Sequence, residues 1–177
     1  MRRLLDALYF GAGVVAAAFV AMIALLMIGQ SILREFGVRT GAVPDVVAWC
    51  CAAAGFFAMA HAFKHGDFVR VTLLLEKASP PVRRTLELIS LLIGAASVSY
   101  LMWAALSFTY ESWAFNDIAT GLLPMPLWIP QLGFAIGSVL LWIAVVDELV
   151  IVLRGGRPTF VVAVEQRHAQ GDFSSDI

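Results

Sequence analysis

The sequence predicts an all-α integral membrane protein with four transmembrane helices, and three observations carry that prediction. Hydrophobic residues make up 60% of the 177 residues, whereas only 14% are charged. A typical soluble domain carries about 25% charged residues, so one water-soluble core cannot accommodate this excess of apolar side chains. The apolar residues also gather in four long runs. A backbone that crosses a bilayer must satisfy its own polar groups, which favours helices over strands of this length.

Each run is long enough to cross a bilayer, which takes about 20 residues in a helix. We expect helices at about 7–33, 44–64, 82–113 and 127–153. Pro44 and Asp45 suit the first turn of the second helix. The first run continues well beyond the apolar core of a signal peptide, so we interpret it as a retained anchor. The sequence thus predicts one membrane domain at 1–156 and a cytoplasmic tail at 157–177.

Basic residues are divided unequally between the two sides of the predicted membrane domain. Four crossings place ten of the twelve on one side: Arg2, Arg3, Lys64, Arg70, Lys77, Arg83, Arg84, Arg154, Arg157 and Arg167. Only Arg34 and Arg39 fall on the other side. The positive-inside rule then predicts that both termini and the connection between helices two and three are cytoplasmic. We expect Tyr110, Trp113 and Trp128 to be aromatic anchors at the outer interface.

The connection between the second and third helices contains the stretch HAFKHGDFVRVTLLLEK, residues 61–77. Gly66 is suited to end the second helix. Residues 68–78 combine aliphatic side chains with Arg70 and other charged residues, and they are too few to cross a bilayer. This pattern predicts a short amphipathic helix at the inner interface, where basic side chains meet anionic phospholipid. A charged loop with some buried leucines is the alternative.

Side chains suited to catalysis or metal binding are few. His61 and His65 are four residues apart and could share a helical face, but no nearby cysteine completes a metal site. We interpret His61 as an interfacial histidine at a helix end. Cys50 and Cys51 point about 100° apart on a helix, so we expect them to be packing residues. The sequence therefore predicts no cofactor, no metal site and no enzymatic activity, and a net charge of −1 gives no indication of nucleic-acid binding.

The middle of each apolar run carries no Asp, Glu, Lys or Arg. Intramembrane charges mark ion and proton pathways, so the chain is poorly equipped to carry a solute by itself. Asp147 and Glu148 come closest, near the end of the fourth helix, where Arg154 could pair with one of them. Gly133 and Gly137 form a small-xxx-small face that allows close helix packing. We expect this packing to be with a partner, and a contact within the chain is the alternative.

Two stretches carry a family resemblance. Matching positions around the second connection are Lys64, Gly66, Val69, Arg70, Val71, Leu73 and Leu74, and those around the start of the fourth helix are Pro126, Trp128, Pro130 and Gly137. With four helices and cytoplasmic termini, the chain resembles over nearly its full length the DctQ-like small membrane subunit of TRAP (tripartite ATP-independent periplasmic) transporters. His65, Phe68 and Thr72 depart from the family pattern, so roles attached to those three positions do not carry over.

The resemblance implies a non-catalytic scaffold subunit in the bacterial inner membrane. In this family a large multi-span subunit holds the substrate and sodium sites, and a periplasmic binding protein delivers an organic acid. Expected contacts with phospholipid or the large subunit involve Lys64, Gly66, Arg70, Arg83 and Arg84. Candidates for receiving the binding protein are Arg34, Arg39, Glu111 and Asp117.

Two other functions remain open from the residues alone. The chain could anchor a redox enzyme and hold haem or quinone near His61, although no convincing second axial histidine is present. It could also be a small carrier that works as an oligomer, although its helices lack the charges that such a carrier uses.

Overall fold

The computed structural model describes residues 2–65, 80–156, 159 and 162. Within these residues there are four helices, α1 (Arg2–Glu35), α2 (Val43–His65), α4 (Pro80–Ala114) and α5 (Trp128–Leu153). All four are long and apolar enough to cross a membrane, which confirms the predicted all-α class with four such helices. The predicted bounds are accurate to within two residues except at the start of α1. The predicted interfacial helix at 68–78 lies outside the described residues, as do Gly66 and Arg70.

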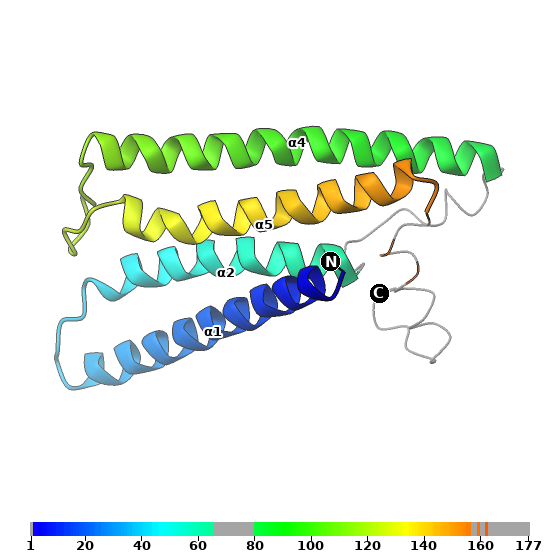
Figure 1. Cartoon of the computed structure of the whole chain (residues 1–177). Helices are drawn as coiled ribbons and strands as arrows, with labels where there is room; N and C mark the ends of the chain where they lie inside the picture. Colours follow the sequence, from blue (N-terminus) through cyan, green and yellow to red (C-terminus); the bar gives the residue numbers. More distant parts are fainter. Residues whose placement is uncertain (1, 66–79, 157–158, 160–161, 163–177) are drawn as a thin grey trace, which may run out of the picture.

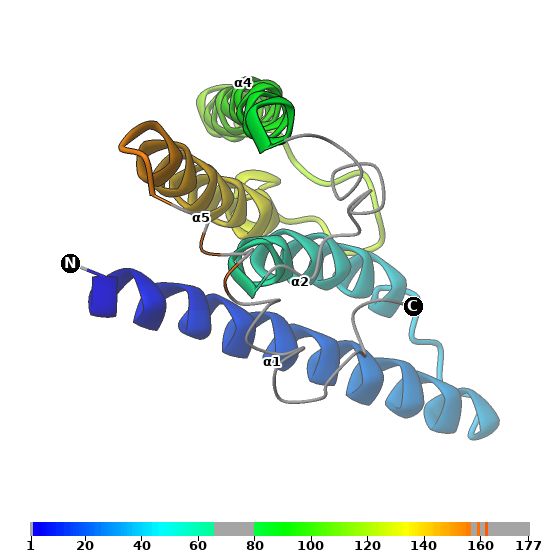
Figure 2. The ribbon, with the colours of Figure 1, turned by 90° about the vertical axis from the view of Figure 1, so that its right-hand side faces the viewer.

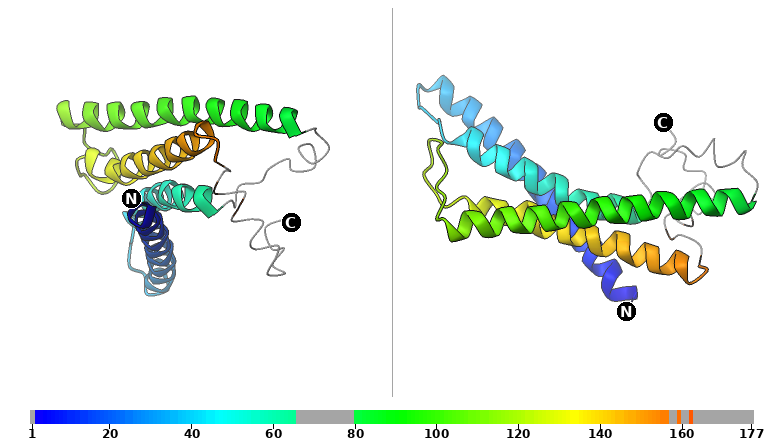
Figure 3. Two further views of the ribbon diagram at one scale, coloured as in Figure 1. Left: turned by 45° about the vertical axis from the view of Figure 1, so that its right-hand side comes forward. Right: turned by 90° about the horizontal axis from the view of Figure 1, so that it is seen from above.

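The four helices lie side by side in a layer that is one helix thick (Figures 1 and 2). α1 packs against α2, α2 against α5, and α5 against α4, so the order across the layer is α1, α2, α5, α4. α1 crosses the other helices obliquely, as the view from above shows (Figure 3). The outer helices α1 and α4 therefore each leave a long face uncovered by the rest of the described chain.

Helix α5 lies inside the layer, and the small core of the protein forms around it. Buried Leu141 and Val145 of α5 cluster with Ala60 of α2 and Ala95 of α4. In the most apolar stretch of α5, 39% of the residues are buried, against 6% in that of the outer helix α4. Exposed apolar surface on this scale is unfavourable in water and neutral in lipid, where apolar tails solvate it.

Glycine residues end two of the helices in the same way. Gly37 follows α1 with φ +74°, and Gly155 follows α5 with φ +82°. This left-handed conformation costs glycine no Cβ clash and lets the last carbonyls accept bonds from the following N–H groups. Accordingly, the amide of Gly156 donates to the Ile151 carbonyl at 2.9 Å.

The layer has two distinct ends. At the charged end, on the right in Figure 1, α1 and α4 begin and α2 and α5 finish. At the loop end, on the left, residues 36–42 connect α1 to α2 and residues 115–127 connect α4 to α5. This arrangement brings side chains from distant parts of the sequence together at each end.

Candidate functional site

An ion-pair cluster joins α2 and α5 at the charged end. The Lys64 ammonium lies 3.0 Å from a carboxylate oxygen of Asp147 and 3.7 Å from one of Glu148. The side chain of Glu148 is completely buried, and that of Lys64 is only 14% exposed. Arg154, considered as a partner for these carboxylates, is the wrong residue. It lies beyond the last residue of α5 with an exposed side chain, whereas Lys64 faces α5 from α2.

Helix α1 joins the same cluster through Tyr9. The Lys64 ammonium lies 5.5 Å from the centre of the Tyr9 ring, which is a favourable cation–π distance. The Nδ1 atom of His61 lies 3.1 Å from the Tyr9 carbonyl oxygen. A Cβ atom at Gly13 would lie 2.7 Å from that same Nδ1, so the absence of a side chain there lets His61 reach α1. His61 is thus a contact between two helices as well as a residue near a helix end.

Glu148 also holds a residue that follows α5. Its two carboxylate oxygens accept hydrogen bonds from the Thr159 backbone N–H and, at 2.5 Å, from the Thr159 hydroxyl. A buried carboxylate is stable only when it is paired and hydrogen-bonded, and Lys64 and Thr159 together meet that requirement. The tail therefore returns to the helix layer at Thr159.

The residues predicted to contact phospholipid or the large subunit do not all lie in one kind of environment. Lys64 forms its ion pair inside the chain. Arg83 and Arg84 lie in the first turns of α4 at the charged end. Their contacts with phospholipid or the large subunit stay a prediction, as do those of Gly66 and Arg70.

The glycine face of α5 packs within the chain. A Cβ at Gly133 would lie 2.7 Å from the Cβ of Ala53, and one at Gly137 would lie 2.6 Å from the Cβ of Phe56. Both contacts are to α2. The structure therefore corrects the assignment of this face to a partner, because α5 lies inside the layer and its small residues meet a neighbouring helix of the same chain.

The two connections at the loop end touch each other. An Asp45 carboxylate oxygen at the start of α2 accepts a hydrogen bond from the Leu122 amide at 3.2 Å. A Cβ at Gly41 would lie 2.5 Å from a methyl carbon of Leu122, so the two connections approach closely. The segment 115–127 is further tied to itself by a bridge between Ile118 and Pro126.

The four docking candidates at the loop end are all exposed, but the structure separates them into two pairs. Arg34 is in the last turn of α1 and Arg39 follows it. Glu111 is near the end of α4 and Asp117 follows that helix. Because α1 and α4 are the opposite outer helices of the layer, the basic pair and the acidic pair lie at different edges.

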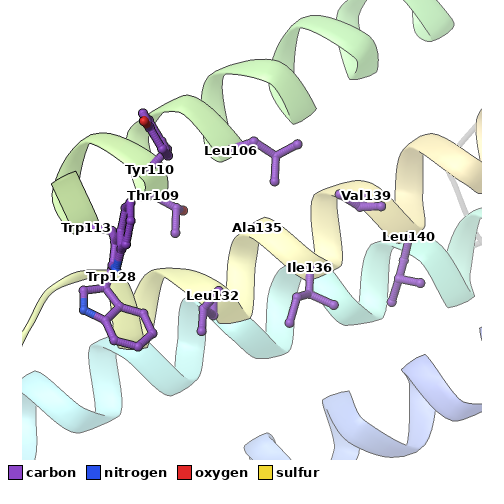
Figure 4. A pocket seen from close by; sticks show the side chains of 10 residues that line it. All are labelled: Leu106, Thr109, Tyr110, Trp113, Trp128, Leu132, Ala135, Ile136, Val139 and Leu140. Atoms are coloured by element: carbon purple, nitrogen blue, oxygen red, sulfur yellow. The ribbon is translucent and has the colours of Figure 1, made fainter.

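An apolar groove of about 400 Å³ runs between α4 and α5 toward the loop end (Figure 4). Tyr110, Trp113 and Trp128 gather at one end of this groove, and aliphatic side chains such as Leu106 and Leu140 line the rest. The three predicted aromatic anchors thus lie at one level of the layer. Sequence reasoning did not identify the groove, because its walls come from two helices whose pairing the sequence does not state.

The fold and these sites define a class of protein. The chain is a multi-pass membrane protein whose charges lie near the helix ends. Among its described residues, no group of three or more His, Cys, Asp or Glu side chains could hold a metal ion.

Comparison with known protein families identifies the family of the chain. The family model described as the DctQ component of tripartite ATP-independent periplasmic transporters matches residues 23–155. The chain belongs to this family and is a small membrane subunit of a TRAP transporter, which confirms the resemblance seen in the sequence. Membership implies in general an association with a large membrane subunit and a binding protein. No curated protein matches the chain.

Proposed function

We propose that this chain is a non-catalytic scaffold that supports the large subunit during binding-protein-dependent, sodium-coupled uptake of an organic acid. The position of the charged residues in the four described helices carries this proposal. All of them lie within about two turns of a helix end, which leaves the middle of the layer without charge. Intramembrane charges mark solute and ion pathways, so their absence from the middle of these helices supports translocation by another subunit.

The proposed orientation puts the charged end in the cytoplasm of a bacterium and the loop end in the periplasm. Counted by residue within the part of the chain that the structure describes, Arg2, Arg3, Lys64, Arg83, Arg84 and Arg154 belong to segments at the charged end, and only Arg34 and Arg39 belong to the loop end. This asymmetry agrees with the positive-inside rule.

The loop end would then receive the periplasmic binding protein. It exposes Arg34 and Arg39 at one edge and Glu111 and Asp117 at the other, so a partner that spans both edges would carry charges of both signs. Long apolar side chains also project there, with Phe36 and Phe115 each 78% exposed and Leu122 74% exposed. Apolar contacts surrounded by charges are typical of protein-binding surfaces.

The scaffold role is supported by the shape of the chain. A layer one helix thick adds width beside a partner without enclosing any path of its own (Figure 2). The function of such a layer depends on a partner, in contrast to a bundle that surrounds a cavity.

A two-part experiment tests the proposal. The tagged chain is purified in mild detergent from its native membrane, and the accompanying proteins are identified by mass spectrometry. We expect a stoichiometric large membrane subunit. Liposomes are then prepared with this chain alone or with the large subunit. Uptake of organic acids should require the large subunit, the binding protein and a sodium gradient.

The alternatives give different results. Uptake by the chain alone would identify a self-sufficient carrier. Recovery of an oxidoreductase, together with a Soret absorption band, would identify a haem-linked anchor.

A further inference from the structure

We propose that the outward face of α4 is the surface that docks onto the large subunit, and that a transmembrane helix of that subunit covers it. This inference rests on the proposed function, since it specifies which edge of the scaffold the partner occupies. The surface, called here the α4 stripe, consists of Leu86, Ser90, Ile93, Ser97 and Tyr100.

The spacing of the α4 stripe places its residues on one face. They are separated alternately by four and three residues, which is the repeat of a helix face that packs along another helix. All five are exposed, with Ile93 at 63% and Tyr100 at 69%. Trp103 is 61% exposed, and its ring centre lies 5.9 Å from that of Tyr100, so it extends the same surface.

The α4 stripe reaches the middle of the membrane-spanning region. Tyr100 lies halfway along the apolar span Thr85–Ala114. The indole of Trp142, near the middle of α5, donates a hydrogen bond at 2.9 Å to the neighbouring Ser99. The position of Tyr100 along α4 and that of Trp142 along α5 therefore both place this part of the α4 stripe near the middle of the membrane. Tyrosine and tryptophan that face lipid are typical of the two interfaces and not of the bilayer centre.

The hydroxyl groups of the α4 stripe have no hydrogen-bond partner among the described residues. Within residues 2–65 and 80–156, the hydroxyls of Ser90, Ser97 and Tyr100 form no hydrogen bond. In contrast, Ser99 donates to the Ala95 carbonyl at 2.7 Å, and Thr109 to the Ala105 carbonyl at 2.8 Å.

Lipid tails offer a hydroxyl no hydrogen-bond partner, whereas an adjacent transmembrane helix can. The small side chains of Ser90 and Ser97 also let such a helix come close. Both properties favour a protein over lipid as the cover of the α4 stripe.

The opposite edge of the layer shows the contrasting composition. Residues 14–28 of α1 read VVAAAFVAMIALLMI and contain no polar side chain. Val20, Leu25 and Ile28 are 57%, 71% and 59% exposed. Hydrocarbon tails suffice to cover such a face. The two outer helices are thus distinguished by hydrogen-bonding capacity at mid-membrane depth, and α4 is the one suited to a protein.

Site-specific photocrosslinking in cell membranes tests this assignment. The photoreactive amino acid p-benzoylphenylalanine replaces Ile93 or Tyr100 on α4 and, as matched controls, Val20 or Leu25 on α1. We expect ultraviolet-dependent adducts with the large subunit from both α4 positions and none from the α1 positions. Adducts from α1, or from none of the four positions, would overturn the proposal.

The same membranes separate this inference from the proposed function. Without irradiation, the tagged chain is purified in mild detergent and examined for the large subunit. If the large subunit is absent, the scaffold function itself fails. If the large subunit is present and no adduct forms through α4, only the assignment of the docking surface fails.

A hydroxyl-deletion pair adds a quantitative measure. Tyr100→Phe should lower the affinity for the large subunit about threefold, which is the size of one interhelical hydrogen bond in a membrane. Thr109→Val removes a hydroxyl that already donates to the Ala105 carbonyl within α4, so it should leave the affinity unchanged. An unchanged or higher affinity for Tyr100→Phe would contradict a hydrogen-bonded protein contact.

Discussion

Two regions of the layer differ in how their apolar surface is covered. The interface between α2 and α5 is covered within the chain, whereas the outer edges are not. At the interface, Gly133 and Gly137 let two backbones approach, and Lys64 pairs with Asp147 at one end. At the edges, α1 and α4 present large side chains such as Leu25 and Tyr100 outward. The inward faces of the helices are therefore held together by close backbone approach and charge pairing within the chain. Its edges depend on lipid or on another subunit.

Among the substitutions that test this comparison, one in the ion-pair cluster should lower the free energy of unfolding most. Lys64→Met removes the cation beside completely buried Glu148, and breaking such a pair costs about 3–5 kcal/mol. We expect a correspondingly lower free energy of unfolding, measured by denaturant titration of the purified protein in detergent micelles. Arg154→Met is the control, because that side chain is exposed and should change stability by less than about 0.5 kcal/mol.

A double variant sharpens the result for the cluster. Replacing both Lys64 and Glu148 by methionine removes the completely buried carboxylate that Lys64→Met leaves without a cation. Asp147 also loses Lys64, but its side chain is 27% exposed and can be solvated, so much of the lost stability should return. Equal losses in the single and double variants would show that the buried charge of Glu148 is not the source of the loss.

The glycine contact between α2 and α5 should come next in size. Gly137→Leu forces a side chain into Phe56, and overpacking of this kind costs about 1–3 kcal/mol. Gly94→Leu is the matched control on α4, where nothing lies within 4 Å of an added Cβ. Thermal unfolding followed by size-exclusion chromatography should separate the two variants. Similar midpoints would mean that the central interface is no tighter than the edge.

A substitution at the contact between α1 and α2 should cost less stability, because the atom nearest to the added Cβ belongs to a side chain and not to the backbone. Gly13→Leu displaces His61, which can rotate, so we expect a loss of about 1 kcal/mol. Gly11→Leu, two residues away, meets nothing within 4 Å. Spin labels at exposed Phe10 and Met59 should show a longer distance only for Gly13→Leu. An increase in both variants would contradict the specific role of Gly13.

The smallest effect is expected at the loop end. Asp45→Asn removes the charge that strengthens the hydrogen bond from the Leu122 amide, and such a change costs about 0.5–1.5 kcal/mol. Hydrogen exchange at the Leu122 amide should become faster. Asp117→Asn is the control, since Asp117 engages Leu127 through its backbone carbonyl and should leave exchange at Leu122 unchanged. No change in Asp45→Asn would show that the two connections are held by packing alone.

The helices could be predicted from the sequence because bilayer thickness fixes the length of an apolar run. The order of the helices across the layer could not be predicted from the sequence. The small-xxx-small pattern at Gly133 and Gly137 says how closely a helix can approach and not which helix does so. Lys64 and Asp147 are 83 residues apart, so their pairing follows only once α2 and α5 are known to be neighbours. Arg154 is much nearer to Asp147 in the sequence, so the sequence alone suggests it as the partner.

The order α1, α2, α5, α4 has a consequence for the synthesis of the chain. α1 can pack against α2 as soon as the two have entered the membrane. α4 then enters before α5, the helix against which it packs, has been made. For that interval the inward face of α4, including Ser99, lacks the described helix against which it packs. Translation order therefore exposes both sides of α4 to the membrane at the moment when a waiting large subunit could first meet it.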